Sequence, residues 1–238
     1  MPGQTPTILL VHGAFAESAS WSEVIEDLQA RGVEVVAAAN PLRSLDGDAA
    51  YVRDVISEIG KPVVLVAHSY GGMVITEAAA RNSAVARLVY VAGFAPDQGE
   101  SAFQLSTKFP GSTLADSATA YPVSSGGNEF AIRQDVFHRQ FAADVPAARA
   151  AIMGATQRPV TEAALSEGLP TDAPAWRHIP SWFVFGDQDM IIPVALHRYM
   201  AERAGAEVSR ELAGASHALS VSEPKAVTAT ILEAAAVP

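Results

Sequence analysis

The chain has 238 residues, 49% of them hydrophobic, which fits one globular α/β domain with an insertion and excludes a largely disordered chain. A formal net charge of −10 disfavours nucleic acid and anionic membrane surfaces as partners. The absence of cysteine excludes disulfides, a thiolate nucleophile and a cysteine-ligated metal ion.

The N-terminal residues show no targeting signal. They lack a positively charged start, and the apolar run at residues 7–11 is shorter than the core of a signal peptide. No apolar run approaches the ~18 residues that a membrane-spanning helix needs. We therefore expect a cytoplasmic protein without a membrane partner. The sequence does not determine the oligomeric state, and a homodimer is compatible with it.

Buried strands alternate with amphipathic helices along the first hundred residues. Continuous apolar runs predict strands at residues 7–11, 35–39, 62–66 and 85–91. Helical patterns lie between them, and Ser20 with Glu23 three positions later predicts a capping box at the start of the first helix. Strands that alternate with helices in this way predict a parallel sheet with helices on both faces.

The alternation stops after Asp97 and resumes close to residue 179. Residues 98–178 are richer in Gly, Ser, Pro and aromatic residues, with helical patterns at 134–142 and 147–153. The strand and helix patterns that follow lie at residues 181–185, 193–204, 208–212 and 224–236. We predict an α/β fold with a doubly wound, mostly parallel sheet of about six strands. Residues 1–97 and 179–238 would form this core, and residues 98–178 a helical cap insertion.

The stretch from Ala67 to Gly72 predicts a nucleophile elbow. It joins an apolar strand to a helical run and places Ser69 at the apex, close to the pattern G-x-S-x-G with Ala67 in place of the first glycine. A serine in a glycine-rich turn is by itself more often only a turn. The strand before it and the helix after it favour the elbow, whose strained backbone lifts the hydroxyl clear of the sheet edge. Ser69 is therefore the candidate nucleophile.

A serine hydroxyl needs a base, which a histidine held by a carboxylate supplies. His217 follows the last predicted strand, and Asp187 and Asp189 follow the strand before it. Both aspartates are candidates on the residues alone, since the Gly-Asp-Gln sequence around Asp187 is also good turn chemistry. We expect structural or solvated roles for the remaining histidines, which are His12, His68, His138, His178 and His197. No HxH or HExxH pattern indicates a metal site, and we expect no cofactor.

Two backbone N–H groups should stabilise an oxyanion beside Ser69. One is that of Tyr70, the residue after the nucleophile. The other is expected in the loop after the first strand, where Gly13 permits a close approach and Ala14 follows it. The alternative interpretation of this loop is a tight turn without a catalytic role.

Over nearly its whole length the chain resembles the α/β-hydrolase superfamily, in a small version that opens at what the family counts as its third strand. Within the superfamily it is similar to a bacterial esterase-like branch related to plant methylesterases and hydroxynitrile lyases. The resemblance is carried by residues 11–14 with Trp21, by the elbow, and by residues 90–97, 186–189 and 216–217. The family's catalytic aspartate stands three residues after the glycine at position 186, which corresponds to Asp189.

The resemblance also implies a cap domain over the site, which matches the predicted insertion. The aromatic residues of the insertion then suit an apolar pocket for an acyl or aryl group. The candidate lining residues are Phe15, Phe94, Phe103 and Phe137.

Two positions depart from the related hydroxynitrile lyases. Ala218 stands where those enzymes carry a lysine, and Gly13 where they carry a threonine, so lyase chemistry is disfavoured. Ser69 argues against the dehalogenases and epoxide hydrolases of the superfamily, which use an aspartate nucleophile.

We expect a cofactor-free serine hydrolase that cleaves a small carboxylic ester through an acyl-enzyme. The same residues would serve on a lactone, an amide, a thioester or the carbon–carbon bond of a diketone. The second interpretation is a small-molecule receptor on the same fold, since some members of the superfamily bind ligands with an intact triad.

Overall fold

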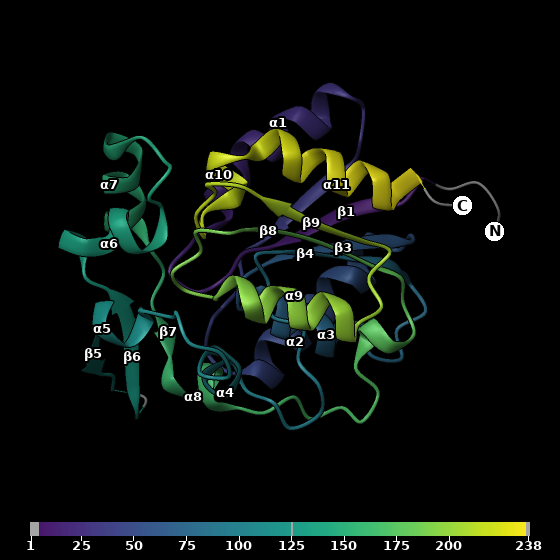
Figure 1. The fold of residues 1–238 in the computed structure, drawn as a ribbon. Coiled ribbons are helices and arrows are strands. Elements are labelled where there is room, and N and C mark those ends of the chain that lie inside the picture. The colour runs from purple at the N-terminus through teal and green to yellow at the C-terminus, as the bar shows by residue number, and fades with distance from the viewer. Residues whose placement is uncertain (1–4, 125, 237–238) are drawn as a thin grey trace.

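A six-stranded parallel sheet lies between two layers of helices in the computed structural model, which describes residues 5–124 and 126–236 (Figure 1). The strand order is β2-β1-β3-β4-β8-β9. The strands are β1 (Thr7–Val11), β2 (Val35–Ala38), β3 (Val63–His68), β4 (Val85–Val91), β8 (Ser181–Gly186) and β9 (Val208–Leu212). Helices α1 (Ser22–Ala30) and α11 (Pro224–Ala236) cover one face, and α2 (Leu45–Ile59), α3 (Gly71–Ala78) and α9 (Val194–Arg203) cover the other. The predicted doubly wound α/β sheet is confirmed.

Both faces of the sheet are buried, which accounts for the continuous apolar runs. Successive side chains of a strand point to opposite faces. In β1, Ile8 and Leu10 pack in the core beneath α1 and α11, whereas Leu9 and Val11 belong to the core shared with α2, α3 and α9. All four side chains are fully buried.

The strand order reverses at β1, and this reversal positions the site. Strand β1 pairs with β2 on one side and with β3 on the other. The connection that leaves the carboxyl end of β1 therefore runs to one side of the sheet, and the connection that leaves β3 runs to the other side. Open α/β sheets bind ligands in the crevice at such a switch point. The loop at residues 12–15 follows β1, and Ser69 follows β3.

The capping box predicted at Ser20 is wrong. Residues Ser18–Trp21 form a short 3-10 helix, and α1 begins only at Ser22. The Ser20 hydroxyl donates to the carbonyl of Glu17 at 2.7 Å. A short polar side chain can form a hydrogen bond with its own local backbone in this way, and the serine then does not cap the helix that follows.

The segment between β4 and β8 contains a second sheet that the sequence pattern did not predict. The described part of this segment also contains five short α-helices, namely α4 (Ala102–Ser106), α5 (Leu114–Ser117), α6 (Gln134–Phe141), α7 (Ala147–Thr156) and α8 (Glu162–Ser166). The sheet is antiparallel and consists of β5 (Ala118–Pro122), β6 (Asn128–Ile132) and β7 (Val160–Thr161). Its strands are short and partly exposed, so they carry no continuous apolar run. The boundaries 98 and 178 stay a prediction.

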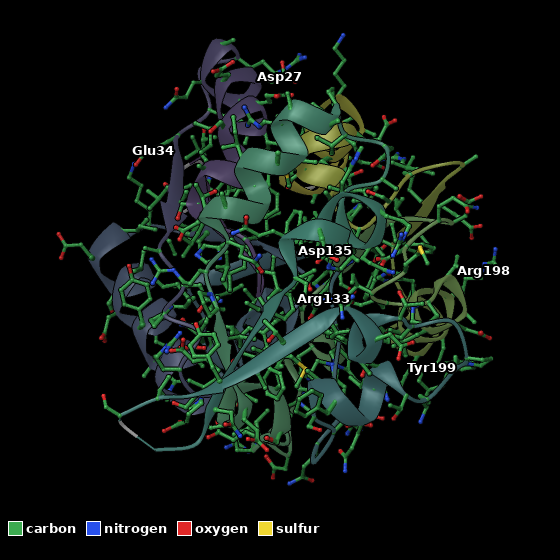
Figure 2. All side chains as sticks on the ribbon, turned by 90° about the vertical axis from the view of Figure 1, so that its left-hand side faces the viewer. Asp27, Glu34, Arg133, Asp135, Arg198 and Tyr199 are labelled. Atoms are coloured by element: carbon green, nitrogen blue, oxygen red, sulfur yellow. The ribbon has the colours of Figure 1, made fainter. Side chains whose placement is uncertain are left out.

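Figure 1 shows the small sheet and α6 and α7 beside the main sheet, and Figure 2 looks onto this cap. Arg133 and Asp135 mark the junction of β6 with α6, where their side chains pair at 3.5 Å. Within the part of the chain that the structure describes, no helix is long and apolar enough to cross a membrane.

Candidate active site

Ser69 sits at the apex of a strained turn between β3 and α3. Its φ is +54°, in the left-handed region that a residue with a side chain rarely adopts, at a cost on the order of 1–3 kcal/mol. Its carbonyl accepts hydrogen bonds from the N–H groups of Gly72 at 2.9 Å and Phe94 at 3.1 Å. A Cβ at position 72 would lie 2.1 Å from the Phe94 carbonyl oxygen, so only glycine fits there. The backbone thus has the strand–turn–helix geometry of an elbow.

Asp189 and His217 are buried in contact at the carboxyl ends of β8 and β9. His217 Nδ1 lies 2.7 Å from Asp189 Oδ2. Asp189 Oδ1 accepts from the backbone N–H groups of Ile191 and Ile192, both at 2.8 Å. Burial alone would raise the pKa of Asp189, but the charge of His217 and the hydrogen bonds that the carboxylate accepts outweigh it and hold that pKa well below its usual range. Asp189 is therefore an anion beside the imidazole.

Asp187 forms hydrogen bonds with the loop backbone and not with the imidazole. Its Oδ1 accepts from the Gly214 N–H at 2.7 Å, and its own N–H donates to the Leu212 carbonyl at 3.1 Å. These bonds tie the loop after β8 to the loop after β9. Of the two aspartates that the sequence left open, the structure places Asp189 against the imidazole.

The far nitrogen of His217 is free to act as a base. A carboxylate only accepts hydrogen bonds, so the proton of the neutral ring is on Nδ1 and Nε2 carries a lone pair. Nε2 is buried and has no hydrogen-bond partner, Ser69 included, among residues 5–124 and 126–236. The ring lies 4.7 Å from that of His68, the residue before Ser69, and meets Phe141 edge-on at 4.9 Å.

His68 links the elbow to the histidine loop. Its Nε2 lies 2.9 Å from the His217 carbonyl oxygen. Burial, reinforced by the charge of His217, lowers the pKa of His68 to about 3. His68 is therefore a neutral structural residue, as the sequence suggested.

Ala14 and Tyr70 line the same small cavity of about 20 Å³ as Ser69. Within the described ranges the backbone N–H of neither residue donates a hydrogen bond to the chain. A Cβ at Gly13 would lie 2.6 Å from that of Ser69, which shows how closely the first loop approaches the elbow. The two N–H groups suit an oxyanion hole.

Two side chains that the sequence did not indicate hold these donors in place. The buried Asn40 donates to the His12 carbonyl at 2.9 Å and anchors the loop that contains Ala14. The Tyr70 hydroxyl donates to Asp48 Oδ2 at 2.9 Å. Neither residue belongs to a recognisable motif, because each acts through a tertiary contact.

The small cavity at Ser69 adjoins a larger one of about 530 Å³. Five residues line both cavities and therefore lie between them, at a position called the neck below: Phe15, Phe103, Ser106, Leu114 and Leu165. The larger cavity is otherwise lined by apolar and small residues that include Phe109 and Phe130, and none of its lining residues is charged. This lining suits an uncharged, largely apolar group.

The predicted pocket residues fall into two groups. Phe15 and Phe103 lie at the neck, and Phe94 lines the inner cavity. Phe137 lines neither cavity, which corrects the prediction. It is buried in the cap and stacks on Phe141 at 5.0 Å, so it lies one layer behind the ring that touches His217.

The cap also holds the loop that carries His217. Asp144, between α6 and α7, accepts from the Ser216 N–H at 3.1 Å and from the Ser216 hydroxyl at 2.5 Å. Ser216 directly precedes His217, so a cap residue fixes the backbone of the candidate base. No sequence signal at Asp144 indicated this contact.

A sequence profile described as the alpha/beta hydrolase family matches residues 8–230, which is most of the chain. The chain belongs to the alpha/beta hydrolase family. It is 27% identical over 250 residues to the alpha/beta hydrolase nvfD of Aspergillus novofumigatus, covering 97% of this chain and 96% of that protein. It is 25% identical to the putative methylesterase 11, chloroplastic, of Arabidopsis thaliana, covering 98% of this chain and 64% of that longer protein.

The structure of polyneuridine aldehyde esterase shares the fold of this alpha/beta hydrolase. The TM-score is 0.81 at 20% sequence identity, and the superposition covers 97% of this chain and 99% of that one. The family resemblance carried by the sequence motifs is thereby confirmed.

Proposed function

We propose that this alpha/beta hydrolase is a serine hydrolase that cleaves a small carboxylic ester through an acyl-enzyme. The observation that carries the proposal is the buried 2.7 Å hydrogen bond between Asp189 and His217, beside a serine held at positive φ. Such a pair leaves a neutral imidazole with its lone pair available and an anion ready to stabilise the imidazolium. The ester bond is favoured because the relatives named above include a methylesterase and an esterase.

In the first half-reaction, Ser69 Oγ attacks the carbonyl carbon while His217 Nε2 takes its proton. The carbonyl oxygen becomes an oxyanion and accepts hydrogen bonds from the N–H groups of Ala14 and Tyr70. One such donor contributes roughly 10²–10³ to kcat in enzymes of this kind. The bond to the alcohol oxygen then breaks, and the imidazolium gives its proton to the departing alcohol.

In the second half-reaction, water attacks the acyl carbon with the same base and the same oxyanion donors. The Ser69–acyl bond breaks, the serine recovers its proton from His217, and the carboxylic acid leaves. Throughout, Asp189 remains ionised and holds the imidazole in one tautomer.

The cavities suggest how the ester is bound. The cavity directly beside Ser69 is only about 20 Å³, so it would hold the scissile group and no bulky substituent. The outer cavity of about 530 Å³ would hold the larger part of the substrate, an uncharged alkyl or aryl group. A carboxylate on that group would be buried without a cation and is disfavoured.

The proposal is tested by hydrolysis of p-nitrophenyl acetate by the purified chain and by Ser69→Ala. We expect many turnovers per chain from the wild type and a loss on the order of 10³ or more in the variant. Release of only one equivalent of p-nitrophenol would indicate a receptor that is acylated without turning over. A Ser69→Ala variant that retains a tenth of the rate would exclude Ser69 as the nucleophile.

A further inference from the structure

A second buried imidazole contacts the same oxygen of Asp189 as His217 does. His197 lies on α9, and its Nε2 is 3.1 Å from Asp189 Oδ2. His217 Nδ1 is 2.7 Å from that atom on the other side. The His197 side chain is almost fully buried. The reaction proposed above makes no use of it.

The geometry determines the tautomer of His197. Because the carboxylate can only accept, the ring donates through Nε2–H. Its Nδ1 is buried and has no hydrogen-bond partner in the described residues. The ring of Phe185 stacks against one face at 4.9 Å, with an angle of 12° between the planes. A second proton on Nδ1 would therefore be buried without an acceptor.

Burial lowers the pKa of His197 in spite of the neighbouring carboxylate. The lowered pKa favours the neutral ring, which donates one hydrogen bond to the carboxylate. From the described residues Asp189 accepts four hydrogen bonds, two from backbone N–H groups on Oδ1 and two from imidazoles on Oδ2.

We propose that His197 is a positioning residue: by sharing Asp189 Oδ2 with His217 it limits how tightly the carboxylate holds the His217 imidazolium. The proposal rests on the proposed function. Without the hydrogen bond from His197, Asp189 Oδ2 would interact with His217 alone. The negative charge would then stabilise the protonated form of His217 more strongly. With His197 present, His217 loses its proton at a lower pH and is a free base over a wider range.

The charged and titratable groups that face the two rings come from several elements. His197 faces Asp189, His217 and, at longer range, Glu211 of β9. Glu211 is an anion held by Arg198, whose Nη2 lies 2.6 Å from its carboxylate. Figure 2 shows Arg198 at the edge of the molecule. His217 also faces His68, which stays neutral above a pH of about 3.

The test compares His197→Leu with His197→Gln. Leucine removes the donor, whereas the glutamine amide nitrogen lies about as far from Cα as the imidazole Nε2 and can replace it. We expect the midpoint of the acid limb of kcat/KM for p-nitrophenyl acetate to rise by roughly half a pH unit or more in His197→Leu. In His197→Gln it should stay near the wild-type value. A midpoint in His197→Leu that equals the wild type, or an equal shift in both variants, would overturn the proposal.

A measurement without turnover separates this proposal from the proposed function and stands if His197→Leu does not fold. In the wild-type chain labelled with ¹⁵N-histidine, the His197 ring should carry its proton on Nε2 and should not titrate between about pH 5 and 9. The His217 ring should titrate at higher pH in any folded His197→Leu sample. A His197 ring protonated on Nδ1, or one that titrates with His217, contradicts the proposal even if esters are hydrolysed.

Discussion

Several residues with side chains adopt positive φ after adjacent strands of the main sheet. Phe15 follows β1 with φ +59°, Ser69 follows β3 with φ +54°, and Ala92 follows β4 with φ +42°. Such conformations persist only where the surrounding structure enforces them, and they concentrate at functional sites. Here the first two bring the Ala14 loop and the elbow together. The strain at the residue scale therefore shapes the edge of the sheet where the ester would bind.

The two aspartates after β8 give a prediction at this scale. Asp189→Asn should lower kcat by roughly 10²–10⁴, because an amide can hold His217 in the wrong tautomer. Asp187→Asn is the matched control, since Asp187 contacts the loop backbone and not the imidazole. Asp187→Asn should lower kcat by less than about tenfold. Steady-state rates on one ester decide the ranking, and a larger loss from Asp187→Asn would refute the assignment of Asp189.

At the scale of elements, the cap contributes both the wall of the cavity and the support of the base. Helix α4 brings Phe103 to the neck between the two cavities. Helix α6 brings Phe141 against His217, and Asp144 after it holds Ser216. Under the proposed function, substrate preference and the position of His217 would therefore depend on different parts of one insertion.

Phe103→Ala should widen the neck. We expect kcat/KM for a p-nitrophenyl ester with a long or aromatic acyl group to rise relative to that for the acetate, by about threefold or more. Phe137→Leu is the control within the same insertion. It should lower the free energy of unfolding by about 1–2 kcal/mol and leave the ratio of the two esters unchanged. A ratio that Phe103→Ala does not alter would place the substrate outside this cavity.

The elements most strongly marked in the sequence are those buried on both sides. Strands at 7–11 and 85–91 were predicted with the bounds they have, because their apolar runs are continuous. The chain order of Ser69, Asp189 and His217 was also predictable, since each follows a strand at the same edge of the sheet. The strands of the cap were missed because they are short and half exposed.

Other parts of the site follow from tertiary contacts that no local pattern encodes. His197 lies on a surface-forming helix and gave no sign that its ring would reach Asp189. Phe137 and Phe141 are equivalent in the sequence, yet only Phe141 meets His217. Both rings belong to the buried apolar side of α6, and the way the insertion folds back decides which of them meets His217.

At the scale of the whole molecule, buried neutral histidines link stability to pH. Burial lowers the pKa values of His12 and His197, and that of His68 to about 3, from an unfolded value near 6.5. As the pH falls below about 6.5, the unfolded chain binds protons that the folded chain does not. The stability present at higher pH is therefore lost progressively, down toward the folded pKa values. Asp48 opposes the trend at lower pH, because burial raises its pKa.

We expect the free energy of unfolding to be lower at pH 5.5 than at pH 7.5. Each histidine that stays neutral contributes about 1.4 kcal/mol to the difference, and the three together up to about 4 kcal/mol. Urea denaturation at the two pH values measures it. His178→Gln is the control, because His178 is exposed in the folded chain and its replacement should leave the difference unchanged. Equal stability at both pH values, or greater stability at pH 5.5, would contradict this account.

The most direct test of the central claim is covalent labelling of the folded chain by a fluorophosphonate, followed by mass spectrometry of the intact protein and its peptides. An activated serine in an elbow should take up one equivalent within minutes, and the adduct should map to Ser69. Ser69→Ala should take up none, although it remains folded, and Asp189→Asn should be labelled much more slowly. A wild-type chain that stays unlabelled, or an adduct on another residue, would contradict the claim that Ser69 is the nucleophile.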